Sequence, residues 1–187
     1  MDSLIQFVST TFQNVRSSKR TDKLHSAVLD YLYYVNPSLA RFDVCYEYTV
    51  DDAFGGTFTV DIALMEDGKL HTAVLCKSIN SNINKNIKNS ANTTIGEAAR
   101  LCYSPLPPEK VVFVTVLPEV APVFTKDGTV RCFDDVIKAK TRTNINRVLT
   151  QQYGTRVTTL DLWYQIPDVE SRTDQHAYDE FTPIVSW

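Results

Sequence analysis

Residues 55–88 (GGTFTVDIALMEDGKLHTAVLCKSINSNINKNIK) contain the pattern that decides the fold of this chain. Apolar residues alternate with polar ones over 58–64 and again after the Asp67-Gly68 turn, and this alternation predicts two antiparallel strands joined as a hairpin. Directly after the second strand, which ends near residue 79, isoleucines four residues apart predict a helix over about 82–103. A strand hairpin that leads straight into a helix is typical of an α/β sheet.

Apolar spacing elsewhere in the chain extends this pattern in both directions. The remaining predicted elements are, in chain order, helices over Met1–Arg16 and Thr21–Val35, a strand over 42–50, a strand buried on both faces over Val111–Leu117, a helix over Phe133–Tyr153 and a strand over 157–165. We therefore expect one α/β domain over residues 1–166, in which a mixed β-sheet is flanked by helices. Residues 167–187 are polar and acidic, and they are expected to form a C-terminal arm, extended or partly disordered.

The composition excludes several classes of protein. The length of 187 residues suits one domain, and the longest apolar run is far below the ~20 residues that cross a bilayer. The four cysteines lie in no CxxC or CxxH pair, so no structural zinc site is expected. The N-terminal residues lack the basic and apolar regions of a signal peptide, so we expect an intracellular protein with free thiols and no membrane partner.

The net charge of -3 is unevenly distributed along the chain. Residues 161–187 hold six acids and one base, so residues 1–160 carry a net charge of +2. Between Lys69 and Arg100 there are five basic residues and one acid, and asparagines are frequent there. Because Lys and Asn side chains suit contacts with phosphates and base edges, a nucleic-acid partner is expected. The candidate contacts are Asn84, Lys85, Lys88, Asn89, Arg142 and Arg147.

Asp61 and Lys77 form a combination that suits phosphodiester chemistry. A carboxylate can hold a divalent cation, and an ammonium group can position the nucleophile and offset the charge that builds on a phosphate. Oxygen ligands of this kind favour Mg²⁺ or Mn²⁺. The register of the hairpin decides whether the two side chains meet. A three-residue loop places them on one face of the sheet, whereas a two-residue loop places them on opposite faces.

Two segments around these residues resemble the PD-(D/E)XK (restriction-endonuclease-like) nuclease superfamily. Val60–Leu64 (VDIAL) is similar to the PDIAL-like segment of the family, and Val74–Ser78 (VLCKS) is similar to its IECKS-like segment. The resemblance covers roughly residues 20–117. It implies a restriction-endonuclease-like αβββαβ core, DNA or RNA as the partner, and a homodimer, since members of the superfamily are often dimers.

The resemblance also implies roles for three residues: Asp61 as a metal ligand, Lys77 as the catalytic lysine, and the Cys76 backbone carbonyl as a further ligand to Mg²⁺ or Mn²⁺. The chain departs from the family pattern two residues before the lysine, where Leu75 replaces the usual acid. An apolar side chain cannot bind a metal ion, so two explanations are open. Either Glu97 supplies the missing carboxylate from the following helix, or the protein has kept the fold and lost cleavage.

Further acids and a histidine extend the candidate site, because the first strand or the helix before it can bring Glu47, Asp22 or His25 near Asp61. The first functional hypothesis is a Mg- or Mn-dependent endonuclease. The second is a catalytically inactive module of the same fold that binds nucleic acid or a protein partner. A third is an α/β protein whose first and last helices mediate contacts with a partner or a second copy.

Overall fold

The computed structural model describes residues 2–13, 18–136, 140–185 and 187, and the side chains of residues 18–20 and 85 lie outside this description. The helices and strands are, in chain order, α1 (Asp2–Ser9), α2 (Ser18–Val35), β1 (Asp43–Asp51), β2 (Thr57–Glu66), β3 (Lys69–Ser78), α3 (Ile83–Cys102), β4 (Lys110–Pro118), β5 (Val120–Phe124), β6 (Val130–Asp135), α4 (Lys140–Tyr153), β7 (Val157–Gln165) and β8 (Ile184–Val185). The predicted fold class, α/β with a mixed β-sheet flanked by helices, is confirmed.

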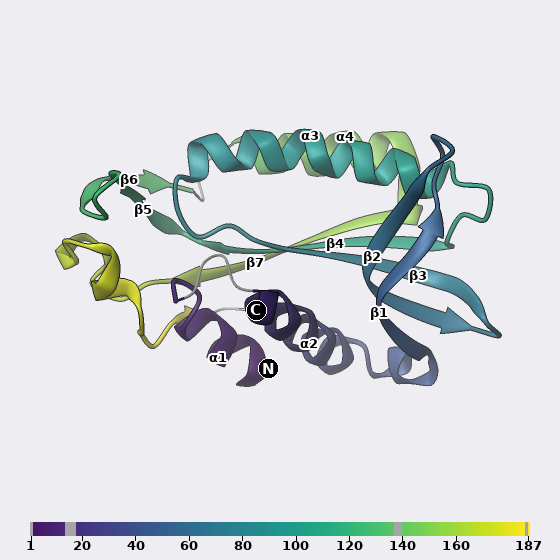
Figure 1. Cartoon of the computed structure of the whole chain (residues 1–187), viewed down its shortest axis with the longest axis horizontal. Helices are drawn as coiled ribbons and strands as arrows, with labels where there is room; N and C mark the ends of the chain where they lie inside the picture. The colour runs from purple at the N-terminus through teal and green to yellow at the C-terminus, as the bar shows by residue number, and fades with distance from the viewer. Residues whose placement is uncertain (1, 14–17, 137–139, 186) are drawn as a thin grey trace.

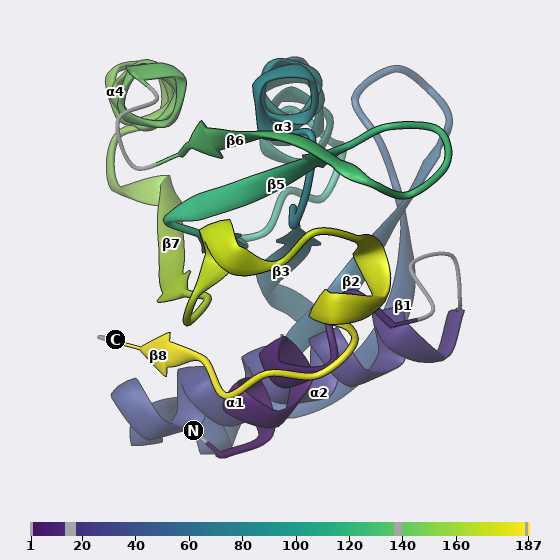
Figure 2. The same cartoon turned by 90° about the vertical axis from the view of Figure 1, so that its left-hand side faces the viewer.

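These elements form three layers. The helices α3 and α4 lie over one face of the sheet, and α1 and α2 lie under the opposite face (Figure 1). Figure 2 shows α3 and α4 side by side in end view. The strands of the main sheet lie in the order β1-β2-β3-β4-β7-β8, while β5 and β6 form a separate two-stranded ribbon. Among the described residues, no helix is both long and apolar enough to cross a membrane.

The centre of the main sheet is parallel, and its edges are antiparallel. The strands β3, β4 and β7 run parallel, whereas β1-β2, β2-β3 and β7-β8 are antiparallel pairs. The helix α3 crosses over from β3 to β4, and helices on both faces cover β4. This arrangement explains why Val111–Leu117 is apolar on consecutive positions. The order α2-β1-β2-β3-α3-β4 follows the expected αβββαβ sequence of elements.

The sequence leaves two registers open for the β2-β3 hairpin. The structure has the two-residue loop of one register and, beyond the loop, the strand alignment of the other. Its loop has two residues, Asp67 and Gly68, whose φ angles of 52° and 73° are those of a type I′ turn. A β-bulge after Leu64 then shifts the pairing by one residue, so that Ile62 pairs with Val74. The strands are therefore aligned beyond the bulge as they would be with a three-residue loop.

Side chains reverse their alternation at one position of the β1-β2 hairpin. In β2, Val60 packs on the α3/α4 side and Ile62 on the α1/α2 side, although residues two apart in a regular strand share a face. In β1, the matching position is Glu47, whose φ of 50° lies in the left-handed region. Glu47 in β1 and Asp61 in β2 are therefore extra residues, one in each strand, at the point where the hairpin twists.

The segment after β4 differs from the prediction. The sequence predicts a helix over Phe133–Tyr153, but β6 extends to Asp135 and α4 begins only at Lys140. Residues 133–135 pair with β5 across the turn near Gly128 and do not form a helix. A local apolar pattern does not reveal a pairing partner elsewhere in the chain, so the helical spacing is misleading here. The first helix is also shorter than predicted, since α1 ends at Ser9.

Residues 167–187 fold back onto the body, which corrects the expectation of an extended arm. They pass through two short 3-10 turns to β8, which pairs with β7 at the edge of the sheet. Tyr178 and Phe181 are buried, and their rings lie 5.3 Å and 6.1 Å from the ring of Phe12. The acidic segment therefore contains aromatic side chains that belong to the core.

Candidate functional site

The Asp61 carboxylate lies where the backbone pairing of β2 and β3 ends. Its Oδ2 accepts a hydrogen bond of 2.6 Å from the Cys76 backbone N–H. A buried N–H without a partner is unfavourable, so the carboxylate takes the place of a strand carbonyl at this point. The side chain of Asp61 is 26% exposed, so the carboxylate holds β3 and still reaches solvent.

His25 lies between two carboxylates on the α2 side of the sheet. Its side chain is 3% exposed, and its Nδ1 lies 3.2 Å from Glu47 Oε1. Its Nε2 lies 3.8 Å from Asp61 Oδ1. The three residues come from α2, β1 and β2, and the two acids reach one histidine because both occupy the reversal of the hairpin. We call His25, Glu47 and Asp61 the histidine–carboxylate cluster.

The histidine–carboxylate cluster has the donor set of a divalent-cation site. One ligand atom from each residue lies within 4.8 Å of the other two. Ligand atoms bound about 2.1 Å from a metal ion lie about 3 to 4 Å apart, so the separations in the cluster, which reach up to 4.8 Å, are wider than those around a bound ion. One imidazole and two carboxylates suit Mn²⁺ or Zn²⁺ better than Mg²⁺, which prefers oxygen ligands.

Burial shifts the protonation of two groups at this point. It raises the pKa of Asp61 above its usual value, although the Cys76 N–H, His25 and Lys77 all act in the opposite direction. Burial also raises the pKa of the Cys76 thiol well above its usual value, and the charges of Asp61 and Glu47 raise this pKa further. Cys76 is therefore a neutral thiol at neutral pH, and its side chain is not a thiolate ligand.

Lys77 pairs with Glu97 on the other side of the sheet. Its Nζ lies 2.7 Å from Glu97 Oε2, and Glu97 comes from α3. Cys76 packs toward α1 and α2, so the next side chain, Lys77, points toward α3 by the alternation of a strand. The predicted site residues thus form two groups. Asp61 lies with His25 and Glu47 on the α2 side of the sheet, whereas Lys77 lies with Glu97 on the α3 side. The charge of Lys77 still reaches Asp61, because it lowers the pKa of that carboxyl.

Leu75 and Asp22 give no ligand to either group. Leu75 is 2% exposed and packs in the core with Ala98 and Leu101 of α3, so the position of the family's usual acid is apolar. Asp22 is exposed on α2 and is not part of the histidine–carboxylate cluster. Of the additional candidates, His25 and Glu47 do join Asp61.

The predicted nucleic-acid contacts lie in different environments. Lys88 and Asn89 of α3 and Arg147 of α4 are exposed. The Asn84 amide is engaged, because its Nδ2 donates a hydrogen bond of 2.6 Å to Asp134 Oδ1. The side chain of Lys85 lies outside the described residues. Three exposed polar contacts on the outer helices therefore remain candidates.

Arg142 corrects one prediction, because it is buried and not part of that surface. Its exposed fraction is 3%. Its Nε and Nη2 both donate to the Asp161 carboxylate, and Nη2 also donates to Thr115 Oγ1 at 3.0 Å. The reason is that Arg142 lies on the buried face of α4, together with Ile145 and Leu149.

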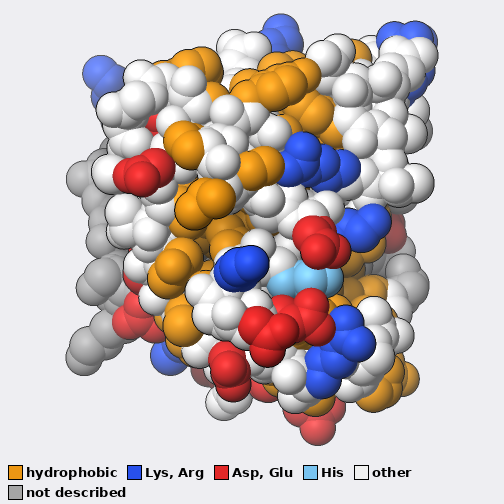
Figure 3. Space-filling model, turned by 90° about the vertical axis from the view of Figure 1, so that its right-hand side faces the viewer, with side chains coloured by type: hydrophobic (Ala, Val, Ile, Leu, Met, Phe, Trp, Pro, Cys, Tyr) orange, Lys and Arg blue, Asp and Glu red, His pale blue; other side chains and the backbone are white. Residues whose placement is uncertain are grey.

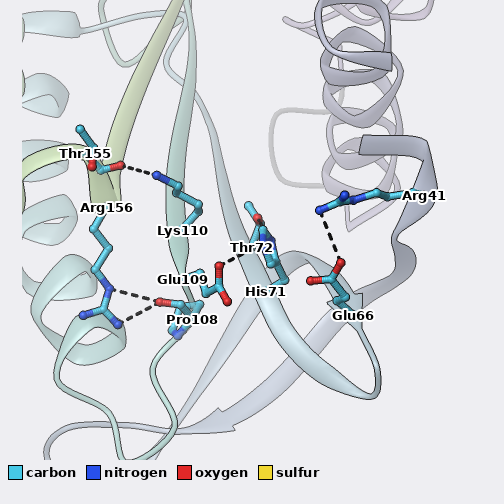
Figure 4. A network of polar contacts seen from close by, with 9 residues as sticks. All are labelled: Arg41, Glu66, His71, Thr72, Pro108, Glu109, Lys110, Thr155 and Arg156. Carbon is cyan, nitrogen blue, oxygen red and sulfur yellow. Dashed lines mark hydrogen bonds and ion pairs between the residues drawn. The ribbon is translucent and has the colours of Figure 1, made fainter. Parts of the chain in front are cut away.

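A pocket of about 630 Å³ opens between the end of β1, the β2-β3 turn and the loop before β4. Its charged lining consists mostly of acids: Asp51, Glu66, Asp67 and Glu109 against Lys69. Figure 3 shows a histidine among acidic and basic side chains at this end of the molecule. In Figure 4, His71 Nε2 lies 3.3 Å from Glu109 Oε2. Excess acid repels phosphate, so this pocket does not suit a nucleic-acid backbone.

Comparison of the chain with protein-family models, curated proteins and solved structures gave no match. The resemblance to the PD-(D/E)XK superfamily stays a prediction. The histidine–carboxylate cluster and the Lys77–Glu97 pair are therefore the features that bear on function. His25 itself could have indicated this cluster from the sequence, because it is a titratable residue next to Leu24 on the buried face of α2.

Proposed function

We propose that this chain is a nuclease-like protein of the PD-(D/E)XK type that acts on nucleic acid with a divalent cation. The observation that carries the proposal is the convergence of His25, Glu47 and Asp61 from three elements, with ligand atoms within 4.8 Å of one another. Lys77 follows Cys76, the residue whose backbone N–H fixes Asp61. The Lys77 side chain points to the opposite face of the sheet, but its charge reaches Asp61, and a metal cluster combined with an ammonium group suits hydrolysis of a phosphodiester bond.

Each residue of the site has a separate task in this proposal. A divalent cation bound at the cluster supplies Lewis acidity and a more acidic water molecule. Glu47 and Asp61 provide the negative charge that attracts it, and His25 provides a nitrogen ligand. Lys77 offsets the negative charge of the phosphate. Glu97, which the sequence predicts as a metal ligand, positions the Lys77 ammonium through their 2.7 Å contact.

The helices α3 and α4 provide further phosphate contacts in this proposal, on the side of the sheet where Lys77 meets Glu97 and opposite the side of His25. Lys88, Asn89 and Arg147 are exposed there, and contacts of this kind bind phosphates without reading sequence. The pocket at the end of the sheet is lined mostly by acids, so it is unfavourable for a polyanion. Binding is accordingly expected to weaken as the salt concentration rises.

A cleavage assay tests the proposal directly. Plasmid DNA, single-stranded DNA and RNA are incubated with the protein in Mg²⁺ or in Mn²⁺, beside the Asp61→Asn and Lys77→Ala variants. We expect cutting that is faster in Mn²⁺, because the donor set includes an imidazole, and that is lost in both variants. Lys126→Gln, which removes an exposed charge far from these residues in the sequence, serves as the control and is expected to keep full activity.

A direct measurement of Mn²⁺ binding accompanies the assay. Titration calorimetry is expected to show one site that disappears in His25→Ala. Cutting that survives equally in Asp61→Asn and Lys77→Ala would come from a contaminating nuclease and would contradict the proposal. Absence of Mn²⁺ binding in the folded wild type would contradict the metal site itself.

A second candidate function is a module of the same fold that binds nucleic acid or a protein partner without cutting. The observation that favours it is the combination of a buried Leu75 with a Lys77 whose charge Glu97 already offsets. Salt-sensitive nucleic-acid binding without cutting would support this candidate. If neither binding nor cutting occurs, a protein partner or a second copy of the chain is the remaining ligand.

A further inference from the structure

The pocket at the end of the sheet combines apolar walls with an acidic rim. Its volume of about 630 Å³ is that of a site for a ligand or for a few side chains of a partner. The apolar lining includes Pro105, Leu106 and Pro107 of the loop before β4, and Figure 3 shows hydrophobic side chains beside the acidic ones at this end. Leu106 is 86% exposed. A side chain of this size gains free energy when a partner covers it.

Two carboxylates of the rim have no cation beside them. Asp51 ends β1, and Asp67 is the first residue of the β2-β3 turn. Both are exposed, and neither forms an ion pair with any described residue. Among the described residues that line the pocket, Lys69 is the only Lys or Arg. These two carboxylates are therefore available to a ligand that brings its own positive charge.

The other two acids of the rim have partners but stay accessible. Figure 4 shows Glu66 beside Arg41, at 3.4 Å, and Glu109 beside His71, at 3.3 Å. The side chains of Glu66 and Glu109 are 47% and 74% exposed, and exposed pairs of this kind are weak. The four acids of the rim outnumber Lys69, Arg41 and His71 even if the histidine is protonated. The rim therefore attracts a cationic ligand.

One wall of the pocket is the free edge of the main sheet. The strand β1 is outermost, with β2 on one side and no described strand on the other. Residues 48–51 all line the pocket, although successive side chains of a strand point to opposite faces. Tyr48 packs in the apolar cluster on the α3/α4 side, whereas the Thr49 hydroxyl lies 3.4 Å from that of Thr59. A wall of four consecutive residues therefore presents the edge of the strand and not one face.

The edge, the acids and the apolar walls together define the ligand. In the described part of the chain, the backbone of residues 48–51 makes no hydrogen bond outside the β1-β2 pair. An extended peptide can pair with such an edge, and its alternate side chains can enter a neighbouring pocket. We infer that residues 48–51 and the pocket form a docking site for a basic, extended segment of a partner protein, which adds a strand to β1. Its Lys or Arg side chains meet Asp51 and Asp67, and an apolar side chain covers Leu106.

A second copy of the chain and a nucleic acid both fit this site poorly. The strand β1 carries Asp43, Glu47 and Asp51 and no base. Antiparallel pairing of two β1 strands around Glu47 would bring Asp43 of one copy opposite Asp51 of the other, and like charges directly opposite one another are unfavourable. The excess of acid repels the phosphates of a nucleic acid. A basic peptide is the partner that the charge favours.

Fluorescence anisotropy of labelled peptides tests the inference. The first peptide alternates lysine with valine and leucine, and in the second peptide glutamate replaces lysine. The third keeps the lysines but has prolines in place of valines, so it lacks backbone N–H groups for strand pairing. We expect the lysine peptide to bind, and to bind more weakly as the salt concentration rises. The proline peptide is expected to bind about tenfold more weakly, and the glutamate peptide not at all.

The measurement is independent of the proposed nuclease activity. It is made in EDTA, which removes divalent cations, and the pocket contains no residue of the histidine–carboxylate cluster. A protein that binds no metal and cuts no nucleic acid is still expected to bind the lysine peptide.

Variants locate the docking site and separate it from the net charge of the protein. Asp67→Asn keeps the turn, because Asn tolerates the left-handed φ of 52° at this position. Asp67→Asn and Leu106→Ser are each expected to weaken binding of the lysine peptide about threefold or more. Glu170→Gln, which removes an exposed acid outside the pocket, is the matched control and is expected to bind as the wild type does. Circular dichroism identifies the folded variants.

Three results would overturn the inference. The first is a folded wild type that does not bind the lysine peptide. The second is equal weakening in Asp67→Asn and Glu170→Gln, which would show that the peptide responds to net charge alone. The third is equal binding of the lysine and proline peptides, which would show that no strand is added to β1.

Discussion

At the scale of single residues, Arg142 and Asp161 form an ion pair that the fold keeps largely out of water. Both nitrogens of one side of the guanidinium donate to the carboxylate, which fixes the start of α4 above β7. A buried pair of this kind adds little net stability compared with apolar residues of the same shape. Removal of one partner is different, because it leaves the other charge buried and unpaired.

The substitution Arg142→Met is therefore expected to lower the free energy of unfolding by about 3 to 5 kcal/mol. Arg147→Met, five residues along the same helix and exposed, is the matched control and is expected to change it by about 0.5 kcal/mol or less. Urea denaturation followed by circular dichroism measures both. Equal effects of the two substitutions would show that Asp161 finds another partner or reaches water.

At the scale of elements, the sequence predicts regular pieces well and irregular ones poorly. The alternation over 58–64 and the Asp67-Gly68 turn identify the hairpin because both signals are local. The β5-β6 ribbon is missed, since Val120–Phe124 becomes a strand only by pairing with Val130–Asp135. The sequence predicts Asp61 as a site residue, but it does not determine the partners of Asp61, because the extra residue in each strand of the hairpin decides them.

The β1-β2 loop depends on a single carboxylate, that of Asp52. Its Oδ1 accepts hydrogen bonds of 2.8 Å and 3.1 Å from the backbone N–H groups of Phe54 and Gly56, and its Oδ2 accepts one of 2.7 Å from Arg100 Nε of α3. Burial by itself raises the pKa of Asp52, but the bonds from Arg100 and from the backbone outweigh it and hold this pKa below its usual value.

This lowered pKa predicts a pH dependence of stability. The ionised carboxylate stabilises the folded protein above the pKa of the unfolded chain, about 3.9, and the contribution is lost as the pH falls through the lower folded pKa. The difference in unfolding free energy between the wild type and Asp52→Asn is thus expected to be full at neutral pH and to shrink below about pH 4. Urea denaturation over a pH series measures it, and a difference that stays constant in acid would contradict the role of the charge.

At the scale of the whole molecule, the C-terminal segment closes the core under the sheet. Phe181 packs against Phe12 and Tyr164, and its backbone N–H donates to the Ser9 carbonyl at the end of α1. The two ends of the chain therefore stabilise each other. A deletion of residues 167–187 is therefore expected to remove part of the core.

Phe181→Ala is expected to lower the free energy of unfolding by about 3 to 5 kcal/mol, because it leaves a cavity between the first helix and the last strands. Phe54→Ala is the matched control, since Phe54 is 73% exposed and is expected to contribute little. Denaturant titrations of both variants measure the difference. A small effect of Phe181→Ala would mean that the C-terminal segment detaches without disturbing the core.

The reversal of the β1-β2 hairpin has a consequence for how this chain can change in length. The pairs on either side of it are Tyr46 with Ile62 and Tyr48 with Val60. If Glu47 and Asp61 were both deleted, these pairs would become neighbours and every other side chain would keep its face. A deletion of Glu47 alone would misalign the strands. The two acids of the cluster thus behave as a matched pair of insertions, so the histidine–carboxylate cluster can be gained or lost here without rebuilding the sheet.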